Sequence, residues 1–293
     1  MTNYPKISIV TPNSNGAEYL EDTIKSVVEQ NYPNLEYIVI DGGSKDESVD
    51  IIKKYQNQIT YWTSEPDDGM YHAIQKGFAR STGEIMAWIN SDDMYHKKAF
   101  YTIAEIFGSF EQVKWLVGAT TAYDTLGRTV LVRPSRLFTK YDFYNRDFRF
   151  IQQESTFWRR SLWQVAGSSL DLSHKYAADL ALWVKFFHYE KLYVIDALIG
   201  GFRWRLKNQL SLDHREEYLK ETDTILSSVF LKEEDNLILL RYKTLLFIDK
   251  CLKKLNLFNL DWMIRFYRRK YFNENSKIVF DRNLMKFIIY EGK

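Results

Sequence analysis

The first ninety residues alternate between short apolar runs and longer segments with helical spacing. Four runs rich in β-branched and aromatic residues predict strands, over residues 6–10, 35–40, 58–63 and 85–89. The segments between them carry apolar residues three and four positions apart and predict helices, over residues 18–30, 48–55 and 70–79. Strands that alternate with helices are joined by right-handed crossovers into a parallel sheet. The pattern therefore predicts an α/β protein with a Rossmann-like, mostly parallel sheet flanked by helices.

Acidic side chains follow the predicted strands at the points where these strands end. Asp41 follows the second strand, Asp68 the third, and Asp92 and Asp93 the fourth. Because ligands bind at the edge where the carboxyl ends of parallel strands meet, these side chains are expected to converge there. Neighbouring carboxylates repel one another, and their oxygens suit a hard divalent cation that carries a nucleotide. The alternative is that Asp41 belongs to an Asp-Gly turn and that Asp92 or Asp93 caps a helix.

The second half of the chain is predicted to complete this domain and then to become helical. Strands are expected over 115–119 and 129–132, and a strand over 152–160 leads into a helix that begins at 161. Another helix is expected to open near 176 and to end at about 187. We therefore expect a domain over 1–213, with halves at 1–110 and 111–213, and a helical C-terminal region over 214–293.

Charge is distributed unevenly along the 293 residues. The formal net charge is +2, but residues 241–270 hold nine Lys and Arg against Asp249 and Asp261, which makes this stretch +7 and the remainder −5. Such asymmetry predicts an anionic partner for the tail. Basic and aromatic residues are interleaved there, as in segments that lie on an anionic bilayer, and the alternative is a helical bundle with a solvated basic face. No nucleic-acid recognition motif accompanies them, so no nucleic-acid partner is expected.

Further sequence features restrict the expected cellular location of the protein and the class of nucleotide-binding motif. The single cysteine, Cys251, excludes an internal disulfide framework and suits a reducing compartment. Residues 1–10 lack the pattern of a signal peptide, and no apolar run approaches the about 18 residues of a membrane span. A cytoplasmic location is expected, in solution or at the inner face of the membrane. No Gly-x-Gly-x-x-Gly or Gly-Lys-Ser/Thr motif follows the first strand, which disfavours dinucleotide and P-loop sites.

Several short motifs occur in an order that is typical of one family. They are Ile-Val-Thr-Pro (9–12), Val-Glu-Gln-Asn-Tyr-Pro (28–33), Ile-Val-Ile-Asp-Gly-Gly-Ser (38–44), Glu-Pro-Asp-Asp-Gly-Met-Tyr (65–71), Lys-Gly (76–77), Thr-Gly-Glu (82–84) and Asn-Ser-Asp-Asp (90–93). Together they resemble the nucleotide-binding half of the family-2 glycosyltransferases, which have the GT-A fold. The resemblance is dense over 6–100 and thinner over 150–215. It implies an inverting transferase of the hexosyltransferase type that uses a nucleotide-sugar donor, UDP-sugars above all, with Mg²⁺ or Mn²⁺ as cofactor.

The same resemblance assigns residues to the nucleotide. Thr11 and Pro12 would line the base pocket, and Asp41 would contact uracil or ribose. Asp68 would lie near the base, and Asp92 near the ribose or the donor sugar. These five residues are the expected core of the donor site.

The metal and the diphosphate are assigned in the same way. Asp93, the last residue of the Asp-x-Asp-like motif, would be the metal ligand. The first position of that motif is Ser91 instead of Asp, which places most of the compensation of metal charge on Asp93. Arg203 is expected to pair bidentately with the phosphates.

The remaining assignments concern the acceptor. A sugar hydroxyl is a poor nucleophile until a positioned carboxylate takes its proton. In the resembled family this carboxylate lies at the start of a helix, where the chain has Asp179, with Ala181 at the place of a frequent second acid. Glu154 is the rival base and is assigned to acceptor binding, with Trp204 as the candidate for sugar stacking. The alternative for Asp179 is a helix N-cap.

The expected function is sugar transfer to a glycan or lipid-linked acceptor during synthesis of a surface polysaccharide such as O-antigen or capsule. One alternative is a sugar-nucleotide pyrophosphorylase, which needs a glycine-rich basic loop after the first strand, whereas residues 11–16 contain no basic residue. The other alternative is a non-catalytic module that binds a nucleotide sugar without turnover.

Overall fold

The computed structural model of the chain describes residues 4–135, 137–147, 151–205, 213–272 and 276–290. Its N-terminal part consists of alternating strands and helices, namely β1 (Ile7–Asn13), α1 (Ala17–Val28), β2 (Leu35–Asp41), α2 (Ser48–Lys54), β3 (Tyr61–Ser64), α3 (Met70–Arg80) and β4 (Ile85–Trp88). Each boundary lies within three residues of the predicted one. The predicted alternation of strand and helix is therefore confirmed.

The middle of the chain is more irregular. Its elements are β5 (Met94–Tyr95), α4 (Ala99–Ser109), β6 (Trp115–Val117), β7 (Thr120–Tyr123), β8 (Thr129–Arg133), α5 (Lys140–Tyr144), the 3₁₀ turn η1 (Gln153–Ser155), β9 (Thr156–Arg159), α6 (Arg160–Val165), α7 (Ala178–Tyr189), β10 (Tyr193–Ile195) and β11 (Gly200–Arg203). The prediction of one strand over 115–119 was wrong at its end, because β6 stops at Val117 and a separate strand, β7, follows. Gly118 allows this break, since a Cβ there would lie 2.6 Å from Cγ1 of Ile199.

The C-terminal part contains helices α9 (Arg215–Ser228), α10 (Glu233–Lys254) and α11 (Asp261–Tyr271), followed by β12 (Lys277–Asp281) and β13 (Lys286–Tyr290). The expectation of a helical region over 214–293 was therefore wrong for its last strands. β12 pairs parallel with β10 and antiparallel with β13. Ile278 is completely buried there, and the apolar run Ile278–Phe280 is rich in the β-branched and aromatic residues that favour a strand.

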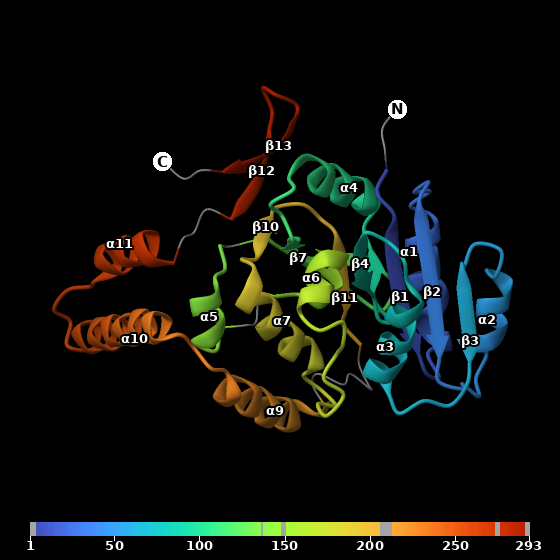
Figure 1. The fold of residues 1–293 in the computed structure, drawn as a ribbon, viewed down its shortest axis with the longest axis horizontal. Coiled ribbons are helices and arrows are strands. Elements are labelled where there is room, and N and C mark those ends of the chain that lie inside the picture. Colours follow the sequence, from blue (N-terminus) through green and yellow to red (C-terminus); the bar gives the residue numbers. More distant parts are fainter. Residues whose placement is uncertain (1–3, 136, 148–150, 206–212, 273–275, 291–293) are drawn as a thin grey trace.

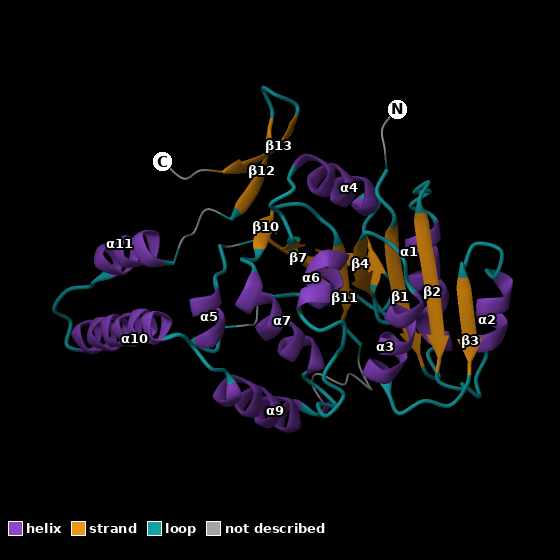
Figure 2. Cartoon of the chain, viewed as in Figure 1, coloured by secondary structure: helices purple, strands orange, loops and turns teal. Residues whose placement is uncertain are grey.

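The main sheet has the strand order β13-β12-β10-β6-β9-β4-β1-β2-β3, and a second sheet has the order β5-β11-β7-β8. β4, β1, β2 and β3 are parallel neighbours, whereas β9 runs antiparallel between β4 and β6. In the register of β1 and β2, Asn13 is opposite Asp41. The parallel part of the sheet therefore brings the loops after β1, β2, β3 and β4 to one edge (Figures 1 and 2).

Two hydrophobic cores separate the sheet from its helices. Val10, Ile38 and Trp88 face a core with side chains of α3, α6 and α7. The alternate residues Ile9 and Val39 face a core with side chains of α1, α2 and α4. Both faces of these strands are thus buried, which explains why they are nearly continuous apolar runs.

Helices α10 and α11 form an antiparallel pair that extends from the domain at the left of Figure 1. A small core of Tyr141, Tyr242 and Phe272 joins this pair to α5. The guanidinium of Arg268 contacts both carboxylate oxygens of Asp142, whose side chain is 4% exposed. Of the basic tail residues, Arg268 therefore points into the protein.

We predict that Arg268→Met lowers the free energy of unfolding by about 3 kcal/mol, because the carboxylate of Asp142 would remain buried without its partner. Urea denaturation followed by circular dichroism measures this change. Arg265→Met, on an exposed face of the same helix, is the control and should change stability by less than about 0.5 kcal/mol. Equal effects of the two substitutions would contradict the assigned role of the ion pair.

Candidate active site

Asp41 lies at the end of β2 and is completely buried. Its carboxylate accepts hydrogen bonds from the Asn13 amide at 2.7 Å, the Ser44 hydroxyl at 2.5 Å and the Ser64 hydroxyl at 2.6 Å. The backbone N–H groups of Gly43 and Ser44 donate to it as well. Burial raises the pKa of Asp41, but these hydrogen bonds outweigh burial and hold the pKa below its ordinary value. The carboxylate of Asp41 thus connects the segments at the ends of β1, β2 and β3 by hydrogen bonds.

Two amide oxygens at this edge have no partner among the described residues. They are Oδ1 of Asn13, at the end of β1, and Oδ1 of Asn90, just after β4. The loops that carry them meet at Gly16, where a Cβ would lie 2.3 Å from Oδ1 of Asn13 and 2.9 Å from Oγ of Ser91. Buried acceptors are rarely left unpaired, so these oxygens are candidates for a ligand with hydroxyl or N–H donors.

Asp93 is completely buried behind this edge. Its carboxylate accepts from the backbone N–H of Arg203 at 2.8 Å and from the side chain of Asn90 at 3.2 Å. Burial, together with the nearby charges of Asp92 and Glu154, raises the pKa of Asp93 well above its ordinary value. This carboxylate therefore lies buried beside two other acidic groups.

Glu154, in η1, lies beside Asp93 and is 6% exposed. Burial raises its pKa to about 7, although a hydrogen bond with Asp93 opposes the shift, and the charges of Asp92 and Asp179 add to it. Gly200 in β11 allows η1 to lie this close, since a Cβ at Gly200 would be 2.0 Å from the carbonyl oxygen of Glu154. Asp92, Asp93 and Glu154 therefore form an acidic group, and the charge of Asp179 also acts on Glu154.

This group fits a divalent cation in its chemistry. Carboxylate oxygens are hard ligands, and a cation would offset the repulsion that raises the pKa of Asp93 and Glu154. Within the described residues, no three His, Cys, Asp or Glu side chains are arranged to hold a metal ion by themselves. Mg²⁺ is usually bound by one or two carboxylates together with substrate phosphates, which agrees with an incomplete protein ligand set.

The predicted phosphate contact of Arg203 does not fit the structure. The side chain is completely buried, and its Nε donates to the backbone oxygen of Asp92 at 2.7 Å. One terminal nitrogen pairs with Asp22 at 3.0 Å, and the guanidinium lies 4.6 Å from the ring centroid of Tyr19. Arg203 therefore fixes the backbone around Asp92 and Asp93. Arg205, which the sequence analysis missed, instead approaches the carboxylate of Asp92 with its Nε at 2.9 Å.

Asp179 lies in the first turn of α7, one residue after the helix begins at Ala178. It is therefore not the N-cap, which is Ala177, so the capping alternative was wrong. Oδ1 of Asp179 accepts from the hydroxyl of Tyr71 at 3.1 Å and from the backbone N–H of Leu180 at 2.8 Å. Burial raises the pKa of Asp179, and the hydrogen bond from Tyr71 partly opposes the shift. A carboxylate with a raised pKa is a better proton acceptor than an ordinary aspartate.

The other predicted site residues lie in varied settings. Thr11 and Pro12 are buried within β1, and the hydroxyl of Thr11 accepts from Tyr37 at 3.1 Å. The side chain of Asp68 is 95% exposed and lies 3.3 Å from His72, outside the acidic group. Trp204 is 49% exposed directly after β11, and its backbone N–H donates to the backbone oxygen of Tyr123 at 2.8 Å.

A family model described as Glycosyl transferase family 2 matches residues 8–161, more than half of the 293 residues. The chain belongs to this family. The match ends near the start of α6, so it includes β1 to β9 and the acidic residues after β2, β3 and β4, but not α7 with Asp179.

Relatives of this family-2 protein come from several bacteria. An uncharacterized glycosyltransferase of Rickettsia prowazekii is 28% identical over 64% of this chain and 61% of its own length. The putative teichuronic acid biosynthesis glycosyltransferase TuaG of Bacillus subtilis is 36% identical over 33% of this chain and 40% of its own length. The aligned parts thus make up less than two thirds of either relative.

Solved structures share the fold. S. aureus TarS 1-349 in complex with UDP-GlcNAc has a TM-score of 0.62 at 18% identity, over 85% of this chain and 73% of that one. The mannosyltransferase PcManGT of Pyrobaculum calidifontis, in complex with GDP-Man and Mn2+, has a TM-score of 0.60 at 14% identity, over 80% of this chain and 67% of that one. The likeness confirms the predicted GT-A arrangement of a mostly parallel sheet between helices.

The family-2 protein holds the start of α7 through a residue that the sequence analysis missed. The carboxylate of Glu221, in α9, accepts from the backbone N–H groups of Lys175 at 2.9 Å, Tyr176 at 2.9 Å and Ala177 at 2.8 Å. These groups would otherwise lack helical partners, and a negative charge favours a helix N-terminus. No local signal could have revealed Glu221, because it lies more than forty residues from its partners.

We predict that Glu221→Ala lowers the free energy of unfolding by about 2–3 kcal/mol, because three N–H groups would lose a charged acceptor. Urea denaturation measures this change. Glu216→Ala, on an exposed face of the same helix, is the matched control and should have an effect below about 0.5 kcal/mol. If Glu221→Ala were as mild as this control, the hydrogen bonds to residues 175–177 would not stabilise the fold.

Proposed function

We propose that this protein is an inverting, metal-dependent glycosyltransferase that takes a sugar from a nucleotide-sugar donor, with a UDP-sugar as the favoured class. The observation that carries the proposal is the gathering of Asp92, Asp93 and Glu154 just after β4 and beside β11, where Asp93 and Glu154 are buried, with the buried carboxylate of Asp179 at the start of α7. A purely structural site would not be expected to hold this much like charge together, since unpaired buried charges are costly. Family membership supports the same activity.

The donor would bind along the edge formed by β4, β1, β2 and β3. Thr11, Pro12 and the loop organised by Asp41 would surround the base and ribose, with Asp68 at the rim. The unpaired oxygens of Asn13 and Asn90 would accept from donor hydroxyl or N–H groups. The solved neighbours in complex with UDP-GlcNAc and with GDP-Man support a nucleotide sugar as the ligand class.

Asp93 would hold Mg²⁺ or Mn²⁺ together with the diphosphate. When bound, the ion would neutralise charge on the leaving nucleoside diphosphate. Asp92, beside Arg205, would face the ribose or the donor sugar. The neighbour in complex with Mn2+ supports this class of cofactor.

Asp179 would act as the general base. Its Oδ1 would take the proton of the acceptor hydroxyl as that oxygen attacks the anomeric carbon from the side opposite the diphosphate, which inverts the configuration. Tyr71 and the backbone N–H of Leu180 would orient the carboxylate. Glu154 remains the rival base, and in the favoured assignment it contacts the acceptor together with Trp204.

The acceptor would be a glycan or lipid-linked saccharide in surface polysaccharide synthesis, at the inner face of the cell membrane. The relative whose description names teichuronic acid biosynthesis supports this class. A sugar-nucleotide pyrophosphorylase is disfavoured, since the loop after β1 carries no basic residue. A binding module without catalysis differs from a transferase only in turnover, which the following experiment measures.

We predict that Asp93→Asn and Asp179→Asn impair different steps. Asp93→Asn should abolish metal-dependent UDP binding in calorimetry, because the ion would lose its protein ligand. Asp179→Asn should preserve binding but lower the transfer rate by about 10²–10⁴-fold, as expected for loss of a general base. Donor hydrolysis across a panel of nucleotide sugars with Mn²⁺ identifies the substrate for these assays. Binding without turnover of any donor or acceptor, and no effect of Asp179→Asn, would favour the binding module.

We also predict a pH dependence that Tyr71 controls. The base must be ionised to act, so kcat/KM should fall as the pH decreases through the raised pKa of Asp179, above the ordinary aspartate value of 3.8. Tyr71→Phe removes a hydrogen bond to the ionised carboxylate, so this acidic limb should move to higher pH. A pH profile of kcat/KM for both proteins measures the shift. If Tyr71→Phe lowered the maximal kcat/KM but left the pH of its acidic decrease unchanged, Tyr71 would affect only the geometry of the site. This result would contradict the predicted shift.

A further inference from the structure

The outer part of the α10–α11 pair, residues 241–270, exposes an unusual amount of apolar surface. This outer arm comprises most of α10, the connecting loop and nearly all of α11, and it is the part of the chain that reaches furthest from the sheet in Figure 1. Six large apolar side chains on it are between 62% and 67% exposed, namely Phe247, Leu255, Leu257, Phe258, Trp262 and Phe266. Clustered exposed apolar residues of this size mark interaction sites.

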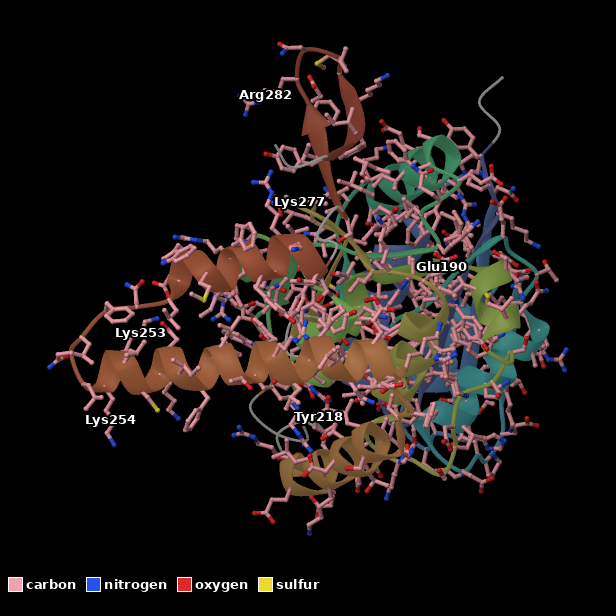
Figure 3. All side chains as sticks on the ribbon, turned by 60° about the vertical axis from the view of Figure 1, so that its left-hand side comes forward. Glu190, Tyr218, Lys253, Lys254, Lys277 and Arg282 are labelled. Atoms are coloured by element: carbon pink, nitrogen blue, oxygen red, sulfur yellow. The ribbon has the colours of Figure 1, made fainter. Side chains whose placement is uncertain are left out.

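Charge on the outer arm is strongly positive. Its two acidic residues, Asp249 and Asp261, both pair with Lys253 at 2.8 Å. Seven further basic side chains are exposed on it, namely Arg241, Lys243, Lys250, Lys254, Arg265, Arg269 and Lys270. Figure 3 shows Lys253 and Lys254 at the outer end of the arm, beside the connecting loop. Without Arg268, which pairs with Asp142, the surface therefore combines aromatic and aliphatic groups with a net charge of +6.

We propose that the outer arm docks on an anionic lipid bilayer, with Leu257 and Phe258 of the connecting loop inserted between the headgroups. Trp and Phe side chains partition into the membrane interface, and neighbouring Lys and Arg are attracted to anionic lipids. The described helices include none with the length and apolarity of a membrane span. The contact is therefore peripheral, through the loop between α10 and α11.

The positive charge of the outer arm favours an anionic bilayer as its binding partner over a second copy of the chain. A two-fold contact would bring the same surface of both copies together, so a patch of +6 would face another patch of +6. Like charges across an interface are unfavourable, and the cores of protein interfaces are depleted in Lys. An anionic bilayer instead complements both the charge and the apolar groups.

Contacts between α10, α11 and α5 fix the position of the loop that connects α10 and α11. The hydroxyl of Tyr267 in α11 donates to the backbone oxygen of Ile238 in α10 at 3.0 Å, which joins the two helices. Asp235, near the start of α10, pairs with Lys140 of α5 at 2.7 Å and accepts from the hydroxyl of Tyr141. Together with the Arg268–Asp142 pair, these contacts hold the arm against the domain, so docking requires no unfolding.

The test is flotation of the full chain with vesicles of phosphatidylcholine, with or without phosphatidylglycerol. The protein should float with the anionic vesicles, and high salt should weaken binding by screening the charges. Leu257→Glu with Phe258→Glu should lower the partition coefficient by more than about tenfold, because two buried apolar groups are replaced by anions. Binding is measured without turnover, so the result does not depend on the proposed enzymatic activity.

The matched control is Phe230→Glu. Phe230 is 90% exposed just before α10, at the other end of that helix from the connecting loop. This substitution should leave flotation unchanged, and equal thermal unfolding of all variants would exclude a folding defect. Equal loss with Phe230→Glu, or no loss with the double variant, would overturn the proposal.

Tryptophan fluorescence provides a second readout. Of the eight tryptophans, Trp204 and Trp262 are the largely exposed ones, at 49% and 63%. Anionic vesicles should shift the emission to shorter wavelength, and Trp262→Phe should abolish this shift while Trp204→Phe retains it. A concentration-dependent dimer in analytical ultracentrifugation that the double loop variant dissociates, without vesicle binding, would identify a second copy as the occupant and refute the bilayer.

Discussion

The mutual repulsion of buried carboxylates is the physical constraint on which the site depends. Asp93 and Glu154 are buried and Asp92 is partly buried beside them. The charges of Asp92 and Glu154 raise the pKa of Asp93, and the charge of Asp92 raises that of Glu154. The fold opposes this repulsion with fixed dipoles, such as the backbone N–H of Arg203 on Asp93, and with the ion pair between Arg205 and Asp92. Asp41 shows the opposite case, because five hydrogen bonds satisfy its carboxylate fully. The site thus consists of a loop whose carboxylate is fully hydrogen-bonded and an acidic group whose repulsion is only partly offset.

The sequence predicted the parallel half of the fold well, because each strand is a local pattern and parallel strands must end at one edge. It could place Asp41 and Asp93 at that edge for the same reason. It could not distinguish Arg203 from Arg205, since both lie at the end of the same strand and only tertiary contacts show which guanidinium is enclosed. Glu221 was missed because its partners are distant in the sequence. The β12–β13 hairpin was missed because a helical pattern extends almost to its start.

The C-terminal region is joined to the rest of the protein at several levels. Glu221 of α9 holds the segment before Asp179, Arg268 of α11 contacts Asp142, and β12 extends the main sheet beside β10. These contacts use a helix terminus, an ion pair and a strand edge. Contacts of all three kinds therefore cross the expected boundary at residue 214.

The contact between Gly200 and Glu154 limits how this scaffold can be diversified. A methyl group at position 200 would collide with the backbone oxygen of residue 154, and backbone cannot yield as a flexible side chain can. A variant must therefore keep glycine there, whereas Trp204, four residues later, is half exposed and has room for side chains of other shapes. Within one short stretch of chain, a position that is sterically fixed thus lies next to one where a substitution could change the choice of acceptor without disturbing the fold.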